Sequence, residues 1–507
     1  MSSLKTLYRH SSHYLGGRVA VMLLGLISFP VFTRIFSVAE YGTINLIANT
    51  VLLLTALSKF GFQHSVQRYY PEGSASAAPD TLRRYYSTLF YSTALLALAL
   101  SLLFIASLFV GAGHLLGITA GGTLLLACSL VIIRSLRSMQ MNLMQMENKT
   151  RLFSGMDILQ KALTIGVVCG LLFFWQKTVF AFFLGLVVVE GLVLLQYLPV
   201  LARRQLLSPG MFDVGFLRTA VAFSLPLMAA EISWVVLDSG DRFFVQHYLG
   251  AQALGFYAAA YGIAIYLQDV LMQPLQMALF PICMRVWNTE GKKATQDFLS
   301  RSLDQFILVA VAVVCVAIVT SRDVIVLLAS RKFQEAHTLL PFLVIGLVLS
   351  AVTIYFRPGL MIHKRASKIA VATFYASILN ILLNVVLLPR IGLLGAAIAT
   401  TVSYGGIVLF LAYQSLRVLP YKVEIASFAR YAVVGAAAAW LVAQVPVETP
   451  LVSAVVKGSL ILVLYAVVLF AVDKRVRELL SDIWTALTGQ PSHKAVLEPL
   501  PAATERT

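Results

Sequence analysis

Apolar and polar residues alternate in long blocks along the chain, with short polar segments between stretches of roughly twenty apolar residues. A helix needs about 20 apolar residues to cross the hydrocarbon core of a bilayer, so each block predicts one membrane-spanning helix. The pattern predicts an all-α integral membrane protein with about fourteen transmembrane helices. They lie near 12–35, 42–63, 84–110, 113–139, 152–174, 178–200, 217–240, 254–283, 301–320, 336–357, 367–388, 393–416, 427–445 and 451–472.

Composition and motifs argue against an enzyme. Of the 507 residues, 59% are hydrophobic and 12% charged, about half the charged fraction of a typical soluble domain. The sequence has no H-E-x-x-H zinc motif, no G-x-S-x-G nucleophile motif and no phosphate-binding P-loop. It has no cysteine spacing typical of a metal site, and we interpret its four cysteines as small apolar residues: Cys128, Cys169, Cys283 and Cys315.

The net charge of +16 has an explanation that does not involve nucleic acid. If the N-terminus is cytoplasmic, thirty of the 39 basic residues fall on the inner side and eight on the outer side. Basic residues favour the cytoplasmic side of membrane proteins, so both termini are predicted to be cytoplasmic. The excess also attracts anionic lipids or an anionic substrate. Lys5, Arg9 and Arg18 precede the apolar run 19–32, which we interpret as an uncleaved first helix because it contains Pro30.

An internal repeat divides the chain. The turn Phe36–Asn45 after the first span resembles the turn Leu249–Ala258 after the seventh, and their glycines, Gly42 and Gly255, are 213 residues apart. Both turns fall on the predicted outer side, which favours two six-helix lobes related by an axis along the membrane normal, with a cavity between them. The predicted divisions are an N-lobe at 1–200, a cytoplasmic linker at 201–216, a C-lobe at 217–416, two additional spans at 427–472 and a cytoplasmic tail at 473–507.

Ionisable groups inside spans are candidates for function, because each costs about 2.5–3.5 kcal/mol at a helix centre. Asp157 and Lys161 lie one turn apart and form either a structural ion pair or part of a charged cavity. Glu190 and Glu231 have no partner nearby in the sequence, which favours a role in ion coupling or substrate contact.

The eighth span carries a polar stripe of Asp269, Gln273 and Gln276. The stripe lines either a water-filled pathway or a polar helix–helix contact. The paired tyrosines at 69–70 and 85–86 are interpreted as aromatic belts at the membrane interface.

Several basic residues lie in or beside spans, where they could bind phosphate groups: Arg18, Arg34, Lys59, Arg68, Lys161 and Arg285. Taken singly, such residues also serve as anchors whose stems reach the interface. Arg18 and Lys161 lie deepest in their spans, which favours a substrate role for these two.

Three stretches carry a family resemblance: Thr33–Gly42, Asp241–Tyr257 and Asn380–Thr400, of which the last contains a Pro389-x-x-Gly392-x-x-Gly395 turn. With these stretches and its fourteen spans, the chain resembles the polysaccharide transport branch of the multidrug/oligosaccharidyl-lipid/polysaccharide (MOP) flippase superfamily. It is most similar to Wzx-type O-antigen and exopolysaccharide flippases.

The resemblance implies a bacterial inner-membrane protein that moves oligosaccharides linked to undecaprenyl pyrophosphate to the periplasmic leaflet by alternating access. It implies a cationic central cavity, membrane-lipid contacts, a proton or sodium gradient as the driver, and a polysaccharide polymerase and chain-length machinery as partners. We assign Arg18, Arg34, Lys161 and Arg285 to the pyrophosphate, and Asp157, Glu190, Glu231, Asp269 and Gln273 to ion coupling or the cavity. No resident cofactor or metal is expected.

Other readings stay open at this point. Fourteen spans also occur in lipid II flippases of the same superfamily. A cation-coupled multidrug exporter would use an acidic cavity dominated by Glu231 and Asp269. A membrane-embedded glycosyltransferase or polymerase would need a larger outer loop than any in this chain.

Overall fold

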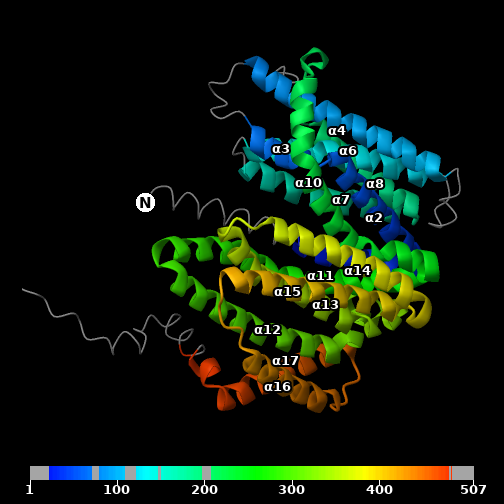
Figure 1. The fold of residues 1–507 in the computed structure, drawn as a ribbon. Helices are drawn as coiled ribbons and strands as arrows, with labels where there is room; N and C mark the ends of the chain where they lie inside the picture. The colour runs from blue at the N-terminus through cyan, green and yellow to red at the C-terminus, as the bar shows by residue number, and fades with distance from the viewer. Residues whose placement is uncertain are drawn as a thin grey trace, which may run out of the picture. The chain divides into compact units, whose positions relative to one another are not determined.

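The computed structural model describes residues 22–70, 79–108, 121–146, 150–196, 207–478 and 481, and within these residues it contains helices and no strands (Figure 1). The first described helix is Met22–Ile35. It is followed by α2 (Val38–Lys59), α3 (Phe62–Tyr69), α4 (Pro79–Ser107), α6 (Gly122–Met146), α7 (Thr150–Phe174), α8 (Val179–Leu195), η2 (Pro209–Met211), α10 (Val214–Ser239), α11 (Asp241–Thr289), α12 (Gly291–Leu328), η3 (Arg331–Thr338), α13 (Leu340–Ile362), α14 (Ser367–Ile391), α15 (Leu393–Val418), α16 (Ile425–Ala443) and α17 (Pro450–Val472).

The predicted all-α membrane fold is confirmed. Eleven described segments are long and apolar enough to cross a membrane, and the helices Met22–Ile35 and Val179–Leu195 are shorter apolar ones. One of the eleven, Val214–Asp269, contains the predicted span 217–240 and the first part of the predicted span 254–283, and between these two Gly250 (φ 82°) interrupts the helical backbone of α11. Each of the fourteen predicted spans therefore has a helix.

The end of α6 differs from the prediction. The fourth span was predicted to end at residue 139, whereas α6 continues to Met146. Hydropathy falls after residue 133 because polar residues begin there, but a helix can continue through polar residues when they pack against other helices. Arg134 and Arg137 consequently lie near the middle of α6 and not at its end.

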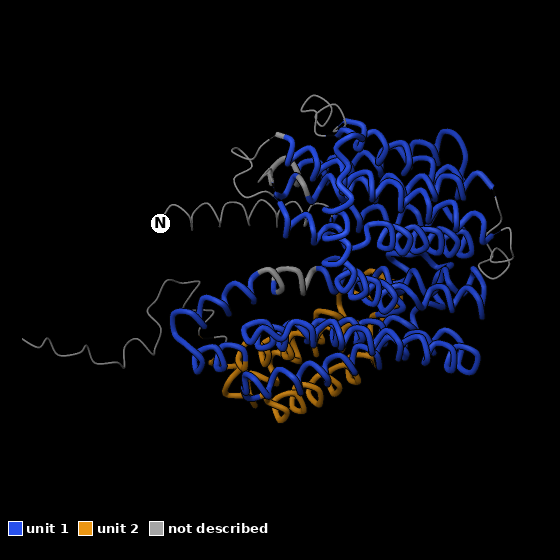
Figure 2. The backbone as a smooth tube through the Cα atoms, turned by 45° about the horizontal axis from the view of Figure 1, so that its top comes forward, with its two compact units in different colours: residues 1–299, 321–422 blue, residues 300–320, 423–507 orange. Residues whose placement is uncertain are grey.

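Two compact units make up the chain (Figure 2). Unit 1 comprises Met1–Leu299 and Ser321–Lys422, and unit 2 comprises Ser300–Thr320 and Val423–Thr507. In unit 1, α6 packs on α2, α4 and α8, while α13, α14 and α15 pack on one another and on α11. The lobe boundaries predicted from the repeat remain a prediction.

Unit 2 joins the middle turns of α12 to α16 and α17. Its core includes Tyr431, Tyr465 and Leu469, and the Tyr431 hydroxyl donates to Asp304 at 3.2 Å. Asp473, at the end of α17, is buried with its carboxylate 3.2 Å from the Arg430 guanidinium.

A helical hairpin forms at the turn between α14 and α15. Gly392 ends α14 with φ 63° and ψ −145°, a backbone conformation essentially restricted to glycine. At Gly395 a Cβ atom would lie 2.7 Å from the carbonyl carbon of Leu387, so only a glycine allows the two helices to approach this closely. The glycines quoted for the family resemblance therefore build this hairpin.

The predicted repeat is visible as a symmetric crossing of α2 and α11. A Cβ atom at Gly42 would collide with the Ala251 carbonyl oxygen, and one at Gly255 would collide with the Val38 carbonyl oxygen. Val38 and Ala251 are separated by the same 213 residues as the two glycines. The two copies of the turn thus contact each other through an approximate two-fold axis, here called the outer crossing (Val38, Gly42, Ala251 and Gly255).

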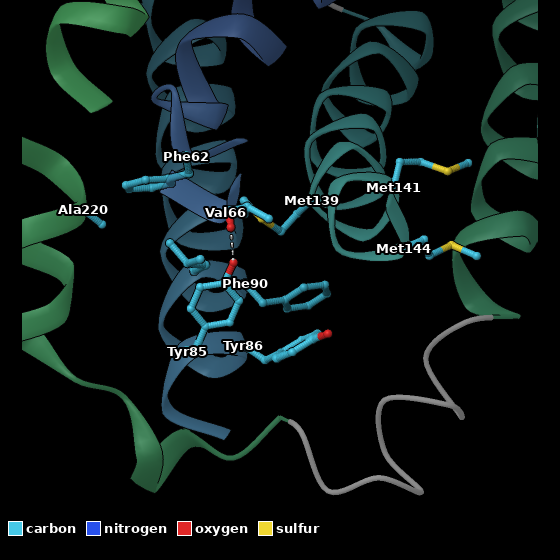
Figure 3. Close-up of a cluster of buried hydrophobic side chains, with 10 residues drawn as sticks. Phe62, Val66, Tyr85, Tyr86, Phe90, Met139, Met141, Met144 and Ala220 are labelled. Carbon is cyan, nitrogen blue, oxygen red and sulfur yellow. Dashed lines mark hydrogen bonds between the residues drawn. The ribbon is translucent and has the colours of Figure 1, made fainter. Parts of the chain in front are cut away.

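A buried cluster of apolar side chains lies at the other end of α2 (Figure 3). Tyr85 and Tyr86 belong to this cluster and are 4% and 2% exposed. The Tyr85 hydroxyl donates to the Val66 carbonyl oxygen at 2.7 Å, which ties α4 to α3. The prediction that these two tyrosines form an interfacial belt is wrong, because both pack inside the protein.

Candidate functional site

Two ion pairs connect α6 to its neighbours within the predicted N-lobe. Arg134 donates from Nε and an Nη to both carboxylate oxygens of Glu190, at 2.9 and 2.7 Å. Arg137 lies one turn further along α6 and donates to Asp157 of α7 at 2.8 Å. Because residues three apart lie on the same side of a helix, α6 presents both guanidinium groups toward α7 and α8.

Lys161 lies beside these pairs without joining either one. Its ammonium group is within electrostatic range of Arg134 and Glu190, yet it has no hydrogen bond or ion pair to any residue that the structure describes. The predicted pairing of Asp157 with Lys161 is not formed, because Asp157 binds Arg137 instead. Three cations and two carboxylates meet here, in what we call the basic cluster (Arg134, Arg137, Asp157, Lys161 and Glu190).

Glu231 of α10 has a basic partner as well. Lys59 at the end of α2 lies 2.7 Å from one carboxylate oxygen of Glu231, and the Gln63 side-chain amide donates to the other. The Lys59 and Glu231 side chains are 19% and 22% exposed, so solvent or a ligand can reach both. Glu190 and Glu231 are therefore not the isolated carboxylates that the sequence suggested, because each has a partner on another helix.

Arg34 binds backbone atoms instead of facing the basic cluster. Its guanidinium donates to the carbonyl oxygens of Leu327 and Pro30 at 2.8 and 3.0 Å. Nearby, the Lys332 ammonium donates to the Phe36 carbonyl oxygen. Burial lowers the pKa of this ammonium, and Glu40 opposes the shift. These contacts cap the end of α12 and join the two predicted lobes beside the outer crossing.

The other predicted site residues lie apart from the basic cluster or outside the described part. Arg285 is exposed near the end of α11. Asp269 is partly buried in the same helix, within electrostatic range of Tyr266. Arg18 lies outside the described residues, and so does the side chain of Gln273.

Sequence reasoning missed a buried charge network in the predicted C-lobe. Asp241 is fully buried and lies 3.2 Å from the Arg242 guanidinium. The Tyr257 and Thr400 hydroxyls donate to its second carboxylate oxygen. The Arg242 guanidinium also stacks 4.2 Å from the centre of the Tyr261 ring.

This network gives a structural meaning to the other resemblance stretches. Asn380 donates to the Thr400 hydroxyl, and Asn384 donates to Asn380 at 3.0 Å, so Asp241–Tyr257 and Asn380–Thr400 meet in one chain of hydrogen bonds. A buried acid needs such partners to remain charged. The adjacent Asp241 and Arg242 at the start of a helix were the signal in the sequence that could have indicated this network. The sequence does not show that they are buried, because their burial depends on α15, which is distant in sequence.

Metal-ligand geometry is absent from the described residues, where no group of three or more His, Cys, Asp or Glu side chains could hold an ion. The predicted N-lobe instead contains a group of fixed charges. The basic cluster carries one cation in excess of its carboxylates, on α6 and α7, which are long and apolar enough to span a membrane, and on the shorter apolar helix α8. Such an arrangement favours an anionic partner.

Comparisons with known proteins agree with this architecture. A family model described as "Polysaccharide biosynthesis protein" matches residues 7–287. The lipid II flippase MurJ in an inward closed conformation has a TM-score of 0.68 at 14% identity, covering 90% of this chain and 99% of that chain. An inward-facing multidrug resistance MATE family transporter of the MOP superfamily has a TM-score of 0.56 at 14% identity, covering 78% and 94%. At these identities the structures show the fold alone. No curated protein matches the sequence significantly.

Proposed function

The chain belongs to the family described as "Polysaccharide biosynthesis protein", and on this premise we propose that it is a flippase of the polysaccharide branch of the MOP superfamily that moves oligosaccharides linked to undecaprenyl pyrophosphate. The proposed location is the bacterial inner membrane, with both termini in the cytoplasm. The proposed direction is toward the periplasmic leaflet, where a polymerase and chain-length machinery use the product.

The observation that carries this proposal is the basic cluster. Lys161 has no partner among the described residues, although a cation within a membrane-spanning helix is costly. A phosphate group would supply the missing negative charge, and Arg134 and Arg137 would add donors that suit phosphate oxygens. We therefore assign the pyrophosphate to Lys161, with Arg134 and Arg137 beside it.

The physical task fits the composition of the chain. A sugar–pyrophosphate head group cannot enter hydrocarbon without losing its hydration, whereas its polyprenyl tail is stable there. A protein need only shelter the head group while the tail stays in lipid. Pro226 interrupts the backbone hydrogen bonds of α10 and provides a point of bending between two states of access. An ion gradient is the proposed driver.

The ion pairs of the carboxylates argue against the export of amphipathic cations. A drug exporter of that kind would present unpaired carboxylates to its substrate. Here Asp157, Glu190 and Glu231 each bind a basic side chain from another helix. The solved structures that share this fold are a flippase and a transporter, which supports a transport role for this chain.

The proposal is tested in cells that lack the gene. Wild-type protein should restore surface polysaccharide and Lys161→Gln should not, with both proteins at equal levels in the membrane. Lys177→Gln is the matched control, because it is the same substitution at an exposed position just after α7. Lipid-linked oligosaccharide should accumulate without the gene. Accumulation of lipid II would identify a lipid II flippase, and drug sensitivity with intact polysaccharide would identify an exporter.

A further inference from the structure

The two predicted lobes contact each other at both ends of α2, and the two contacts differ in kind. At the outer crossing, backbone meets backbone without intervening side chains. At the opposite end the Gly61 backbone also lies close to that of Ser224, but beside it an ion pair joins side chains that remain partly exposed, here called the inner latch (Lys59, Gln63 and Glu231). Charged side chains can exchange partners before the helices move. Backbone atoms in close contact can separate only if the helices themselves move apart.

Buried polar and apolar contacts surround the inner latch. The Ser65 and Ser224 hydroxyls are 2.8 Å apart, and the Ser224 hydroxyl donates to the Gly61 carbonyl oxygen at 3.0 Å. These join α3 and the segment between α2 and α3 to α10, where Phe216 of α10 also packs against Tyr69 of α3. A partly exposed ion pair contributes about 0.2–1 kcal/mol, which corresponds to a population ratio of about five at most. The ion pair is therefore the part of this contact that an anionic ligand can replace at a small cost in free energy.

The residue before Lys59 contacts α6, the helix that carries Arg134 and Arg137. This residue, Ser58 of α2, shares a hydrogen bond with Ser135 of α6. Arg134, which binds Glu190, immediately precedes Ser135 in the sequence. The same contact between α2 and α6 is thus flanked by a cation from each helix.

We propose that Lys59 is a second phosphate-binding residue that Glu231 occupies in this conformation, and that a phosphate group opens the inner latch by replacing the Glu231 carboxylate. This proposal rests on the proposed function for the identity of the ligand. A phosphate carries more negative charge and more acceptor oxygens than a carboxylate, so it competes effectively for the Lys59 ammonium. Once Glu231 is displaced, the ion pair no longer adds to the serine and apolar contacts that hold the predicted lobes together at this end.

Distance measurements test the latch independently of transport. Spin labels are attached at position 68 in α3 and position 219 in α10. The native residues there, Arg68 and Thr219, are both exposed, and one lies in each predicted lobe. Pulsed electron paramagnetic resonance on the full-length protein in nanodiscs gives the fraction of molecules with a long separation. Glu231→Gln should raise the ratio of long to short separations about two- to fivefold. The control Lys293→Gln removes a charge from an exposed surface pair and should leave the ratio unchanged.

The charge-swapped double variant Lys59→Glu with Glu231→Lys should return the ratio to that of the wild type, because it restores the attraction. If Glu231→Gln does not fold, Lys59→Gln removes the same ion pair from the other side. Unchanged distances in both single variants would overturn the latch.

Geranyl pyrophosphate is the probe for the ligand. It should lengthen the distances in the wild type and have no effect in Lys59→Gln, whose latch is already open. Geranyl alcohol, which lacks the charge, should have no effect on either protein. An open latch in Glu231→Gln together with a wild type insensitive to geranyl pyrophosphate would overturn the phosphate assignment. Failure of the proposed function would appear separately, as normal distances in a protein that moves no lipid-linked oligosaccharide.

Discussion

Gly42 and Gly255 offer a quantitative test of the outer crossing. An alanine Cβ at Gly42 would lie 2.8 Å from the Gly255 nitrogen and closer still to the Ala251 carbonyl oxygen. An alanine Cβ at Gly255 would lie 2.7 Å from the Val38 Cγ1 atom and closer still to its carbonyl oxygen. Real Cβ atoms essentially never approach a heavy atom within 3.0 Å, so either substitution must push α2 and α11 apart.

The expected cost follows from overpacking. Inserting a methyl group into a close contact costs about 1–3 kcal/mol, and here the obstructing atoms are backbone atoms that cannot change rotamer. Because the crossing is nearly two-fold symmetric, Gly42→Ala and Gly255→Ala should destabilise by similar amounts. The double variant should cost less than the two single effects together, since one separation of the helices relieves both collisions.

Thermal unfolding of the purified protein in detergent measures these differences. Gly166→Ala is the matched control, because a Cβ at this position of α7 meets no atom within 4 Å. Both crossing variants should unfold at clearly lower temperature than the control, which should unfold at or above the wild-type temperature. The symmetric crossing would be refuted if all three single variants unfolded alike, or if the double variant lost the full sum of both effects.

Three further outcomes follow from other contacts and are checked by the same unfolding measurement. Glu190→Gln should lower the free energy of unfolding by about 1.5–3 kcal/mol, because it weakens two charged hydrogen bonds from Arg134. Adding Arg134→Gln to this variant should recover part of the lost stability. A further loss of stability would contradict a direct pair between the two residues. Gly392→Ala should cost about 1–3 kcal/mol from backbone strain, whereas Gly405→Ala, with its nearest side-chain neighbour at 3.9 Å, should be nearly neutral. Asp473→Asn should lower the unfolding temperature because the buried carboxylate faces Arg430, and an unchanged temperature would show that this pair contributes nothing to unit 2.

The fold was accessible from the sequence because a bilayer restricts helix length and polarity. Apolar blocks of about twenty residues had to be helices, and each of the fourteen corresponds to one. Helix ends were harder to place, as α6 shows, because polar residues near Arg134 continue the helix when other helices supply partners. The repeat was also visible, since a backbone crossing requires glycine in both copies.

The site was less accessible, because partners come from different helices. The spacing of Asp157 and Lys161 is compatible with a local ion pair, but the Asp157 carboxylate binds Arg137 of another helix instead. Glu231 has no basic residue nearby in the sequence, and its partner Lys59 lies 172 residues away. Side-chain pairing across helices depends on packing that hydropathy does not encode. The spacing of Arg134 and Arg137 on one side of α6 was the signal that could have located the basic cluster.

Transbilayer movement of a lipid-linked oligosaccharide in proteoliposomes tests the central claim most directly. Purified protein is reconstituted with undecaprenyl-pyrophosphate-linked oligosaccharide in vesicles, an ion gradient is imposed, and a membrane-impermeant lectin reports the glycan exposed outside. Wild-type protein should change the exposed fraction with time, Lys177→Gln should match it, and Lys161→Gln should leave the fraction as in protein-free vesicles. A wild-type protein that moves no glycan, or a Lys161→Gln variant that moves it at the wild-type rate, would contradict the account.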